Sequence, residues 1–250
     1  MYVEKTTNIT YTSDAKYIES GVAGKIKAAY QTLLQQQIWS LRSFPEGQRN
    51  CYNFNMTAKR KYLIRGVFIY GNYDGLNQLP NFELHIGPNN WSSVVNLGAT
   101  NGSLHELIHV LTQDRLQVCL VKTGETTPFI NSLEIRPLDN DTYVMQSGSL
   151  IMVGRFYFSP TPTFVRYDED TDDRIWVPYL DKKNSVLTTD ESVDTRNKYN
   201  VPQAVAKTAG VPANVRQPLT IDLSLDEKNA HSYIYMHFAE IKNLTDNETR

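Results

Sequence analysis

The sequence predicts a mostly β protein of the β-sandwich class, for two reasons. Short runs rich in Tyr, Val, Ile and Phe alternate with clusters of Gly, Pro, Asn and Asp, a pattern typical of strands joined by turns. In the best-defined run, Phe82, Leu84 and Ile86 fall on one face, with polar residues between them. One buried and one solvated face is typical of antiparallel sheets, so this inventory favours a sandwich.

The expected strands are short and are rich in β-branched and aromatic residues. In chain order they span residues 62–70, 81–86, 116–121, 130–136, 146–158, 219–225 and 232–241. Residues 25–41 do not follow the strand pattern, because their apolar side chains recur at helical spacing. This spacing predicts a single amphipathic helix packed on the sandwich. A short helical turn is expected over residues 201–208, where Pro202 suits the first helical position.

Length and composition exclude several classes of protein. With 250 residues, 40% of them hydrophobic, the chain can bury a core without metal or disulfide staples. The net charge of −2 leaves no excess of Lys and Arg to neutralise phosphates, which argues against nucleic-acid binding. The longest apolar stretch, residues 150–158, is far shorter than the roughly 20 residues of a membrane-spanning helix. The N-terminus lacks the pattern of a secretory signal.

Asn-x-Ser/Thr acceptor sites nevertheless indicate a secreted, glycosylated surface. The candidate glycosylation sites are Asn8, Asn55, Asn90, Asn101, Asn140, Asn243 and Asn247. Both cysteines, Cys51 and Cys119, lie in stretches that read as strands. A secreted chain can join such a pair in one disulfide; the alternative is two buried free thiols, and the sequence leaves both open.

Residues 159–163, rich in Pro and Thr, have the composition of a domain edge. We therefore expect a first domain over residues 1–148, a connector over 149–163 and a second domain over 164–250. Residues 233–240 echo residues 62–68, which indicates two copies of one sandwich.

Two motifs match metal-binding patterns only in part. His105 and His109 flank a glutamate as in zinc proteases, but that site requires a helix and a third ligand, and this stretch runs into an expected strand. The acidic run 168–173 lacks the Gly and Glu that an EF-hand loop needs, so we expect a solvated acidic turn. The sequence contains no nucleophile elbow, phosphate-binding loop or Cys-x-x-Cys motif.

The loop after the first strong strand carries side chains suited to carbohydrate. Aromatic rings stack on the apolar faces of sugars, while carboxylates and amides bind hydroxyls. The candidate ligand-binding residues of this rim loop are Tyr70, Asn72, Tyr73 and Asp74. The alternative is that Tyr70 packs in the core while Asn72 and Asp74 shape a turn.

Eight strings resemble the malectin-like ectodomain of plant receptor-like kinases, particularly those with leucine-rich repeats. They lie in family order at residues 41–52, 62–75 (YLIRGVFIYGNYDG), 116–124, 127–130, 133–138, 173–176, 201–205 and 235–241 (YMHFAEI). The similarity covers essentially the whole chain.

The resemblance implies two tandem malectin-type β-sandwiches, jelly-roll-like and the second one truncated, with at most short helices around residues 25–41. It places residues 105–110 on a β element. It also implies an extracellular glycoprotein region at the plasma membrane that is non-catalytic and binds no cofactor or metal. The parent chain would carry leucine-rich repeats, a membrane helix and a Ser/Thr kinase domain. The chain departs from the family at both ends, so we expect a fragment or a truncated product.

The implied ligand is a cell-wall glycan or a secreted peptide, with co-receptor ectodomains as further partners. The alternative is a structural module that pairs receptors without a ligand of its own, and a zinc hydrolase is the least supported option. Animal malectin binds glucose disaccharides through rim aromatics. Of its Tyr-Phe pair, which falls near Asn72 and Tyr73, only the second aromatic is kept here.

Overall fold

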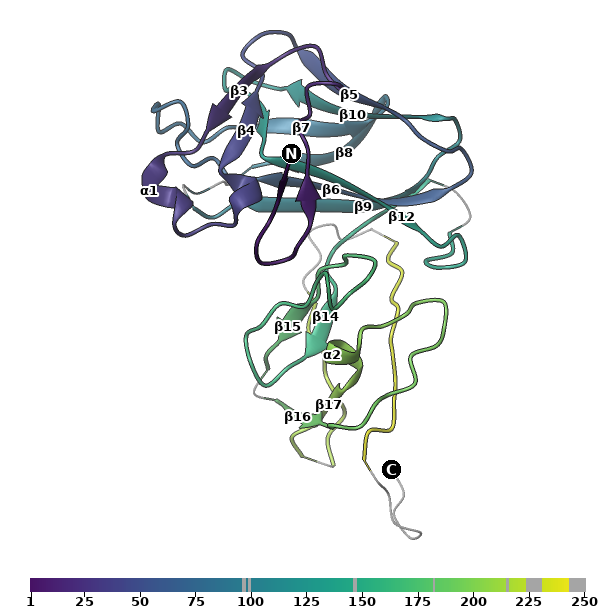
Figure 1. Ribbon diagram of the computed structural model, residues 1–250. Coiled ribbons are helices and arrows are strands. Elements are labelled where there is room, and N and C mark those ends of the chain that lie inside the picture. Colours follow the sequence, from purple (N-terminus) through teal and green to yellow (C-terminus); the bar gives the residue numbers. More distant parts are fainter. Residues whose placement is uncertain are drawn as a thin grey trace. The chain divides into compact units, whose positions relative to one another are not determined.

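The chain folds into two compact units, which are described separately. The computed structural model describes residues 1–95, 98, 100–145, 148–181, 183–214, 216–223 and 231–242. Unit 1 spans Met1–Met152 and unit 2 spans Val153–Arg250 (Figure 1). Strands dominate and the helices are short, which confirms the predicted mostly β fold.

The first four-stranded sheet of unit 1 is antiparallel throughout. Its strands lie in the order β5 (Arg49–Asn55), β10 (Arg115–Lys122), β7 (Phe82–Ile86) and β8 (Asn89–Val94). The alternation predicted in β7 is present, because its three apolar residues are buried while the two polar ones between them are partly exposed.

The second four-stranded sheet has the order β12 (Ser132–Leu138), β6 (Lys61–Phe68), β9 (Ser103–Val110) and β13 (Ser149–Ile151). Inward side chains of both sheets form one apolar cluster, to which β5, β6, β7, β9 and β10 all contribute. The two sheets are therefore the two layers of a sandwich (Figure 1).

Smaller sheets complete unit 1. A hairpin of β1 (Tyr2–Val3) and β2 (Thr10–Tyr11) forms the N-terminus. β3 (Val22–Lys25), β4 (Ser40–Ser43) and β11 (Phe129–Ile130) form a three-stranded sheet in the order β11-β4-β3.

The single helix predicted over residues 25–41 is wrong. The segment contains a four-residue helix, α1 (Ala28–Gln31), and a single 3₁₀ turn, η1 (Gln36–Ile38), before β4 begins. The N–H of Ile26 donates to the Trp39 carbonyl at 3.1 Å, so the segment folds back on itself instead of continuing as a rod. Leu33, which a helix would bury with its neighbours, is 71% exposed. Only short helices occur here, as the resemblance implied.

Unit 2 has two small sheets and a core of its own. β14 (Phe156–Phe158) pairs in parallel with β15 (Val177–Tyr179), and β16 (Asn184–Thr188) pairs antiparallel with β17 (Thr208–Pro212). Its helix α2 (Gln203–Ala206) follows Pro202, which is the N-cap and not the first helical residue. The core comprises Tyr157, Val165, Trp176, Val201 and Val205.

Three predicted strands of the second half differ in the structure. Of residues 146–158, the first two lie outside the described residues, and the rest hold two strands, β13 in unit 1 and β14 in unit 2. Residues 219–223 and 231–242 are not in strands, and Phe238 is 84% exposed. Strand propensity needs a partner strand to take effect, and no strand pairs with these described residues. None of the helices in the described ranges has the length and apolar character needed to cross a bilayer.

Candidate functional site

The rim loop begins two residues after β6 and is held by its own side chains. The Tyr70 hydroxyl donates to the Asp74 carboxylate and lies 3.3 Å from Asn72 Oδ1. Asn72 has a positive φ of 47°, a conformation that Asn tolerates, and its side chain bonds both the backbone and the amide of Asn77. Asp74 also accepts the Leu76 N–H at 3.0 Å. The loop is therefore a closed network.

The aromatic rings of the rim loop face the protein. Tyr70 is buried, and Tyr73 is packed against the same core cluster. The Tyr73 ring centroid lies 5.6 Å from that of Tyr70 and 5.5 Å from that of Phe129. Of the four candidate residues only Asp74 is exposed. This geometry matches the turn-forming alternative, and sugar stacking on these rings stays a prediction.

The electrostatics of the loop agree with this packing. Burial and the hydrogen bond to Asp74 raise the pKa of Tyr70 to about 12. The hydroxyl is therefore protonated at neutral pH and remains the donor to Asp74. Leu76 and Leu79, on the same loop, are 66% and 50% exposed. The accessible side chains of residues 74–79 are thus one carboxylate, two leucines and the amides of Asn77 and Gln78.

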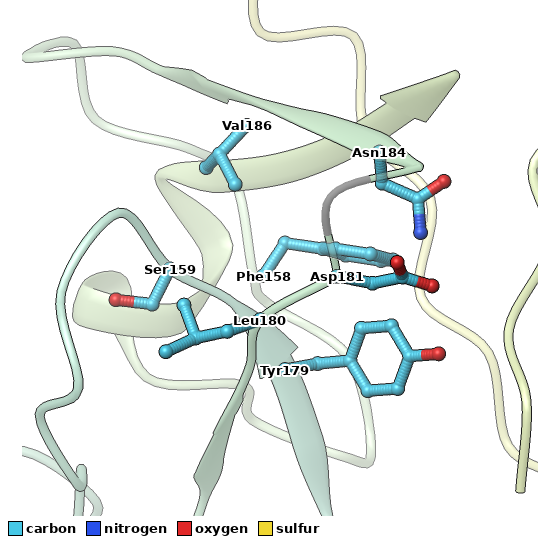
Figure 2. A pocket seen from close by; sticks show the side chains of 7 residues that line it. All are labelled: Phe158, Ser159, Tyr179, Leu180, Asp181, Asn184 and Val186. Carbon is cyan, nitrogen blue, oxygen red and sulfur yellow. The ribbon is translucent and has the colours of Figure 1, made fainter. Parts of the chain in front are cut away.

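A pocket in unit 2 was not indicated by the sequence. Figure 2 shows its lining, a cavity of about 320 Å³ bordered by Phe158, Ser159, Tyr179, Leu180, Asp181, Asn184 and Val186. The rings of Phe158 and Tyr179 meet edge to face at 5.6 Å. Asn184 Nδ2 donates to the Thr220 carbonyl, whereas its Oδ1 is buried and has no hydrogen-bond partner among the described residues. The parallel pairing of β14 with β15, which sequence periodicity does not reveal, brings these rings together.

The zinc-protease pattern is not assembled. His105 and His109 lie on β9, so they share one face of a strand while Glu106 points to the other. His105 Nδ1 is 2.8 Å from Ser92 Oγ, and His109 Nδ1 is 2.8 Å from Ser149 Oγ. Burial lowers the pKa of both imidazoles. No group of three or more metal-ligating side chains exists among the described residues.

The acidic run 168–173 is not the solvated turn expected from the sequence. Asp170 and Asp173 are each 1% exposed. Asp170 binds Arg174 Nε at 2.8 Å and Trp176 Nε1 at 2.6 Å, and Asp173 binds Arg166 at 2.9 Å. The two buried carboxylates, which a bound cation would need as ligands, are thus paired with arginine side chains. The spacing of these arginines in the sequence did not indicate the pairing.

The cysteines and acceptor sites have the features of a secreted chain. Cys51 and Cys119 lie directly opposite each other on β5 and β10 and are joined in a disulfide. The asparagines of the five described acceptor sites are all exposed: Asn8, Asn55, Asn90, Asn101 and Asn140. The candidates Asn243 and Asn247 lie outside the described residues.

The sandwich and its cross-strand disulfide define a class of protein, the disulfide-bonded β-sandwich module. Comparison with known families specifies it further. The model of the malectin-like domain matches residues 1–250, and the chain belongs to this family. It has the fold of a non-catalytic malectin-like ectodomain.

Relatives in Arabidopsis thaliana match along the whole chain. The chain is 72% identical to the probable LRR receptor-like protein kinase At1g51890, covering 100% of this chain and 28% of that protein. It is 48% identical to the LRR receptor-like serine/threonine-protein kinase IOS1, covering 99% of this chain and 28% of that protein. The chain thus spans little more than a quarter of the length of these relatives.

Solved structures share the fold at low sequence identity. The ANX1 ectodomain from Arabidopsis thaliana has a TM-score of 0.66 at 14% identity, covering 83% of this chain and 62% of that chain. A structure of the plant peptide RALF23 in complex with FER and LLG2 has a TM-score of 0.64 at 16% identity, covering 82% of this chain and 62% of that chain.

Proposed function

We propose that this chain is the ligand-sensing part of the extracellular region of a plant receptor-like kinase, and that its ligand is a secreted peptide. The observation that carries the choice of ligand is the rim loop. Its tyrosine rings pack inward, while Asp74, Leu76 and Leu79 are exposed. Leucine side chains beside a carboxylate suit a peptide with apolar and basic residues better than they suit a sugar ring.

Two comparisons support a receptor role. The relatives that match the whole chain are named as receptor-like kinases. A structural neighbour, FER, was solved in complex with the peptide RALF23 and with LLG2. By analogy with that assembly, a co-receptor that contacts the peptide-loaded chain is the second partner we propose. The proposed location is the outer side of the plasma membrane, to which other segments of the parent receptor attach this region.

The experiment compares retention of secreted peptides by three forms of the chain. Unmodified protein, Leu76→Ser/Leu79→Ser and the control Leu33→Ser are each immobilised and incubated with the peptide fraction of plant apoplastic fluid. Retained peptides are quantified by mass spectrometry. We expect the double variant to lose roughly tenfold or more of the retention, and the control, which changes an equally exposed leucine elsewhere in unit 1, to keep it.

A second experiment tests the carbohydrate alternative. Calorimetric titration with glucose disaccharides is expected to show no binding to the unmodified chain. Sugar binding that is lost in Tyr73→Ala and Asp74→Ala would replace the peptide proposal with the rim-loop carbohydrate site. Retention of no peptide, or equal retention by the double variant, would contradict the proposed site.

A further inference from the structure

Two of the exposed acceptor asparagines lie on the two edge strands of one sheet. β5 and β8 are the outer strands of the order β5-β10-β7-β8, so each has one neighbour strand among the described residues. Asn55 is the last residue of β5, and Asn90 is the second residue of β8. An edge strand presents free N–H and C=O groups on which another chain can pair.

Both side chains point away from the core. Asn55 is registered opposite Arg115, and Asn90 opposite His85, and all four residues belong to the solvated face of the sheet. Their neighbours along the strands, Phe54 and Trp91, belong to the core-facing set, because side chains of a strand alternate between its faces. A large substituent on either asparagine would therefore extend into solvent beside an open edge.

The two amides are chemically free to carry such a substituent. Within the described part of the chain the Asn55 side chain makes no hydrogen bond. The Asn90 side chain makes none either among these residues, although, after His85, its proximity helps to lower the pKa of the Glu83 carboxyl. Asn140 differs, because its Nδ2 donates to the Lys59 carbonyl while its Oδ1 accepts the Lys61 N–H.

The usual protection of an edge is weaker on β8 than on β5. Natural sheets guard their edges with charged residues, Pro, bulges or covering segments. β8 contains neither a charged residue nor Pro, and its one irregularity is the extra residue Trp91, which the register skips between the pairs Leu84–Ser92 and His85–Asn90. β5 begins with Arg49, and the N–H of its Asn53 already donates to the Tyr17 carbonyl at 2.9 Å. The β8 edge therefore depends more on its asparagine.

We propose that Asn55 and Asn90 carry N-linked glycans that block edge-to-edge pairing of this sheet, with Asn90 the more important site. The glycan donor is a lipid-linked pyrophosphate oligosaccharide. The Asn Nδ2 forms a bond to the anomeric carbon of the sugar, the bond from that carbon to the phosphate oxygen breaks, the lipid pyrophosphate leaves with the electron pair, and Nδ2 loses one proton.

The test uses the full chain exported through the secretory pathway of plant cells. Peptide mass spectrometry gives the occupancy of each site, and sedimentation velocity gives the association state across a wide range of concentrations. We expect both sites to be occupied and the protein to be monomeric. Asn90→Gln should shift the protein from monomer to dimer or larger species, and Asn55→Gln should do so less strongly.

Two control variants separate edge protection from a general effect of glycans on solubility. Asn90→Lys removes the glycan but places a charge on the edge, so it should remain monomeric. Asn101→Gln removes a glycan from the loop before β9, an interior strand of the other sheet, and should also remain monomeric. If a variant fails to fold, trimming the folded, unmodified chain with an endoglycosidase, which leaves one sugar and no new charge on Asn90, should produce the same association. An unoccupied Asn90, a monomeric Asn90→Gln protein, or equal association of Asn101→Gln would overturn the proposal.

Discussion

Arg65 connects three strands of unit 1 through a single guanidinium group. It is fully buried, and Nη2 binds Glu106 on β9 while Nη1 binds Glu134 on β12, each at 2.8 Å. Glu134 also accepts the hydroxyl of Tyr11 from the N-terminal hairpin at 2.7 Å. The register of β6 with β9 and β12 places the three charged residues side by side. The ion pairs therefore fix that register and attach the hairpin to the sheet.

Replacing Arg65 with methionine should be strongly destabilising. The variant leaves two carboxylates buried without their cation, and breaking a buried ion pair in this way costs about 3–5 kcal/mol. Urea unfolding of Arg65→Met and of the unmodified chain measures the difference. The matched control is Arg115→Met on the exposed face of β10, which should change stability by about 0.5 kcal/mol or less. Similar losses in both variants would show that Arg65 has no special role.

Asp14 makes the stability of unit 1 sensitive to acid. Burial raises the pKa of its carboxyl, but hydrogen bonds from Arg42, at 2.6 and 2.7 Å, and from Tyr52, at 2.8 Å, outweigh burial and leave the pKa below its ordinary value. A carboxyl whose pKa is lower in the folded state adds stability above its unfolded pKa of about 3.9, and this stability is lost as the pH falls from there through the folded-state pKa.

We therefore expect Asp14→Asn to lose about 1 kcal/mol at neutral pH and to lose less than the unmodified chain on acidification to about pH 3. Free energies of unfolding at the two pH values measure both effects. Asp141→Asn, at an exposed aspartate, is the control and should follow the unmodified protein. An unchanged pH dependence in Asp14→Asn would refute the assignment.

For single residues, the sequence predicted which side chains lie in the rim loop but not all of their contacts. The residue types of the rim loop pointed to a binding loop after a strong strand, and the strand and the turn are present. Core packing of Tyr70 was one of the two expected alternatives, whereas the inward direction of the Tyr73 ring could not be predicted, because it depends on Phe129, which lies far along the chain. The ion pairs of Arg65 were missed for the same reason, since Glu106 and Glu134 become its neighbours only through strand pairing. Asp170 and Arg174 are only four residues apart, but their pairing depends on the conformation of the loop between them.

At the level of elements, the strands of unit 1 were predictable and the helix was not. β6, β7 and β10 lie within two residues of their predicted positions, because each has a clear hydrophobic pattern between turn residues. The apolar residues of 25–41 have helical spacing, but Ile26 and Leu41 are buried where β3 pairs with β4 beside the core, and Leu33 is exposed. In residues 231–242 the strand pattern is strong, yet it lacks a paired strand among the described residues.

The disulfide between β5 and β10 should contribute substantially to the stability of unit 1. It closes a loop with a sequence separation of 68 residues, and linking such a loop typically stabilises a domain by about 2–4 kcal/mol. We expect Cys51→Ser, Cys119→Ser and the double variant to lose similar amounts, because either change breaks the same bond. Thermal unfolding measures the loss, and thiol alkylation without reduction should label no cysteine of the unmodified chain. Labelling of both cysteines would contradict the pairing.

At the level of the whole molecule, each unit has its own apolar core. We expect calorimetry of the 250-residue chain to show two unfolding transitions. Cys51→Ser/Cys119→Ser should lower only one transition temperature. Arg174→Met, which removes the partner of buried Asp170, should lower only the other. A single transition shifted by both variants would show that the units unfold together.

The cross-strand disulfide also limits how far the molecule can be stretched. β6, β7, β8 and β9 all lie between the two bonded cysteines, so tension applied to the chain ends bypasses them. An extended chain reaches about 3.5 Å per residue, so the 68-residue loop withholds about 240 Å of length. Under load, an oxidised unit 1 would therefore extend about 240 Å less than a reduced one.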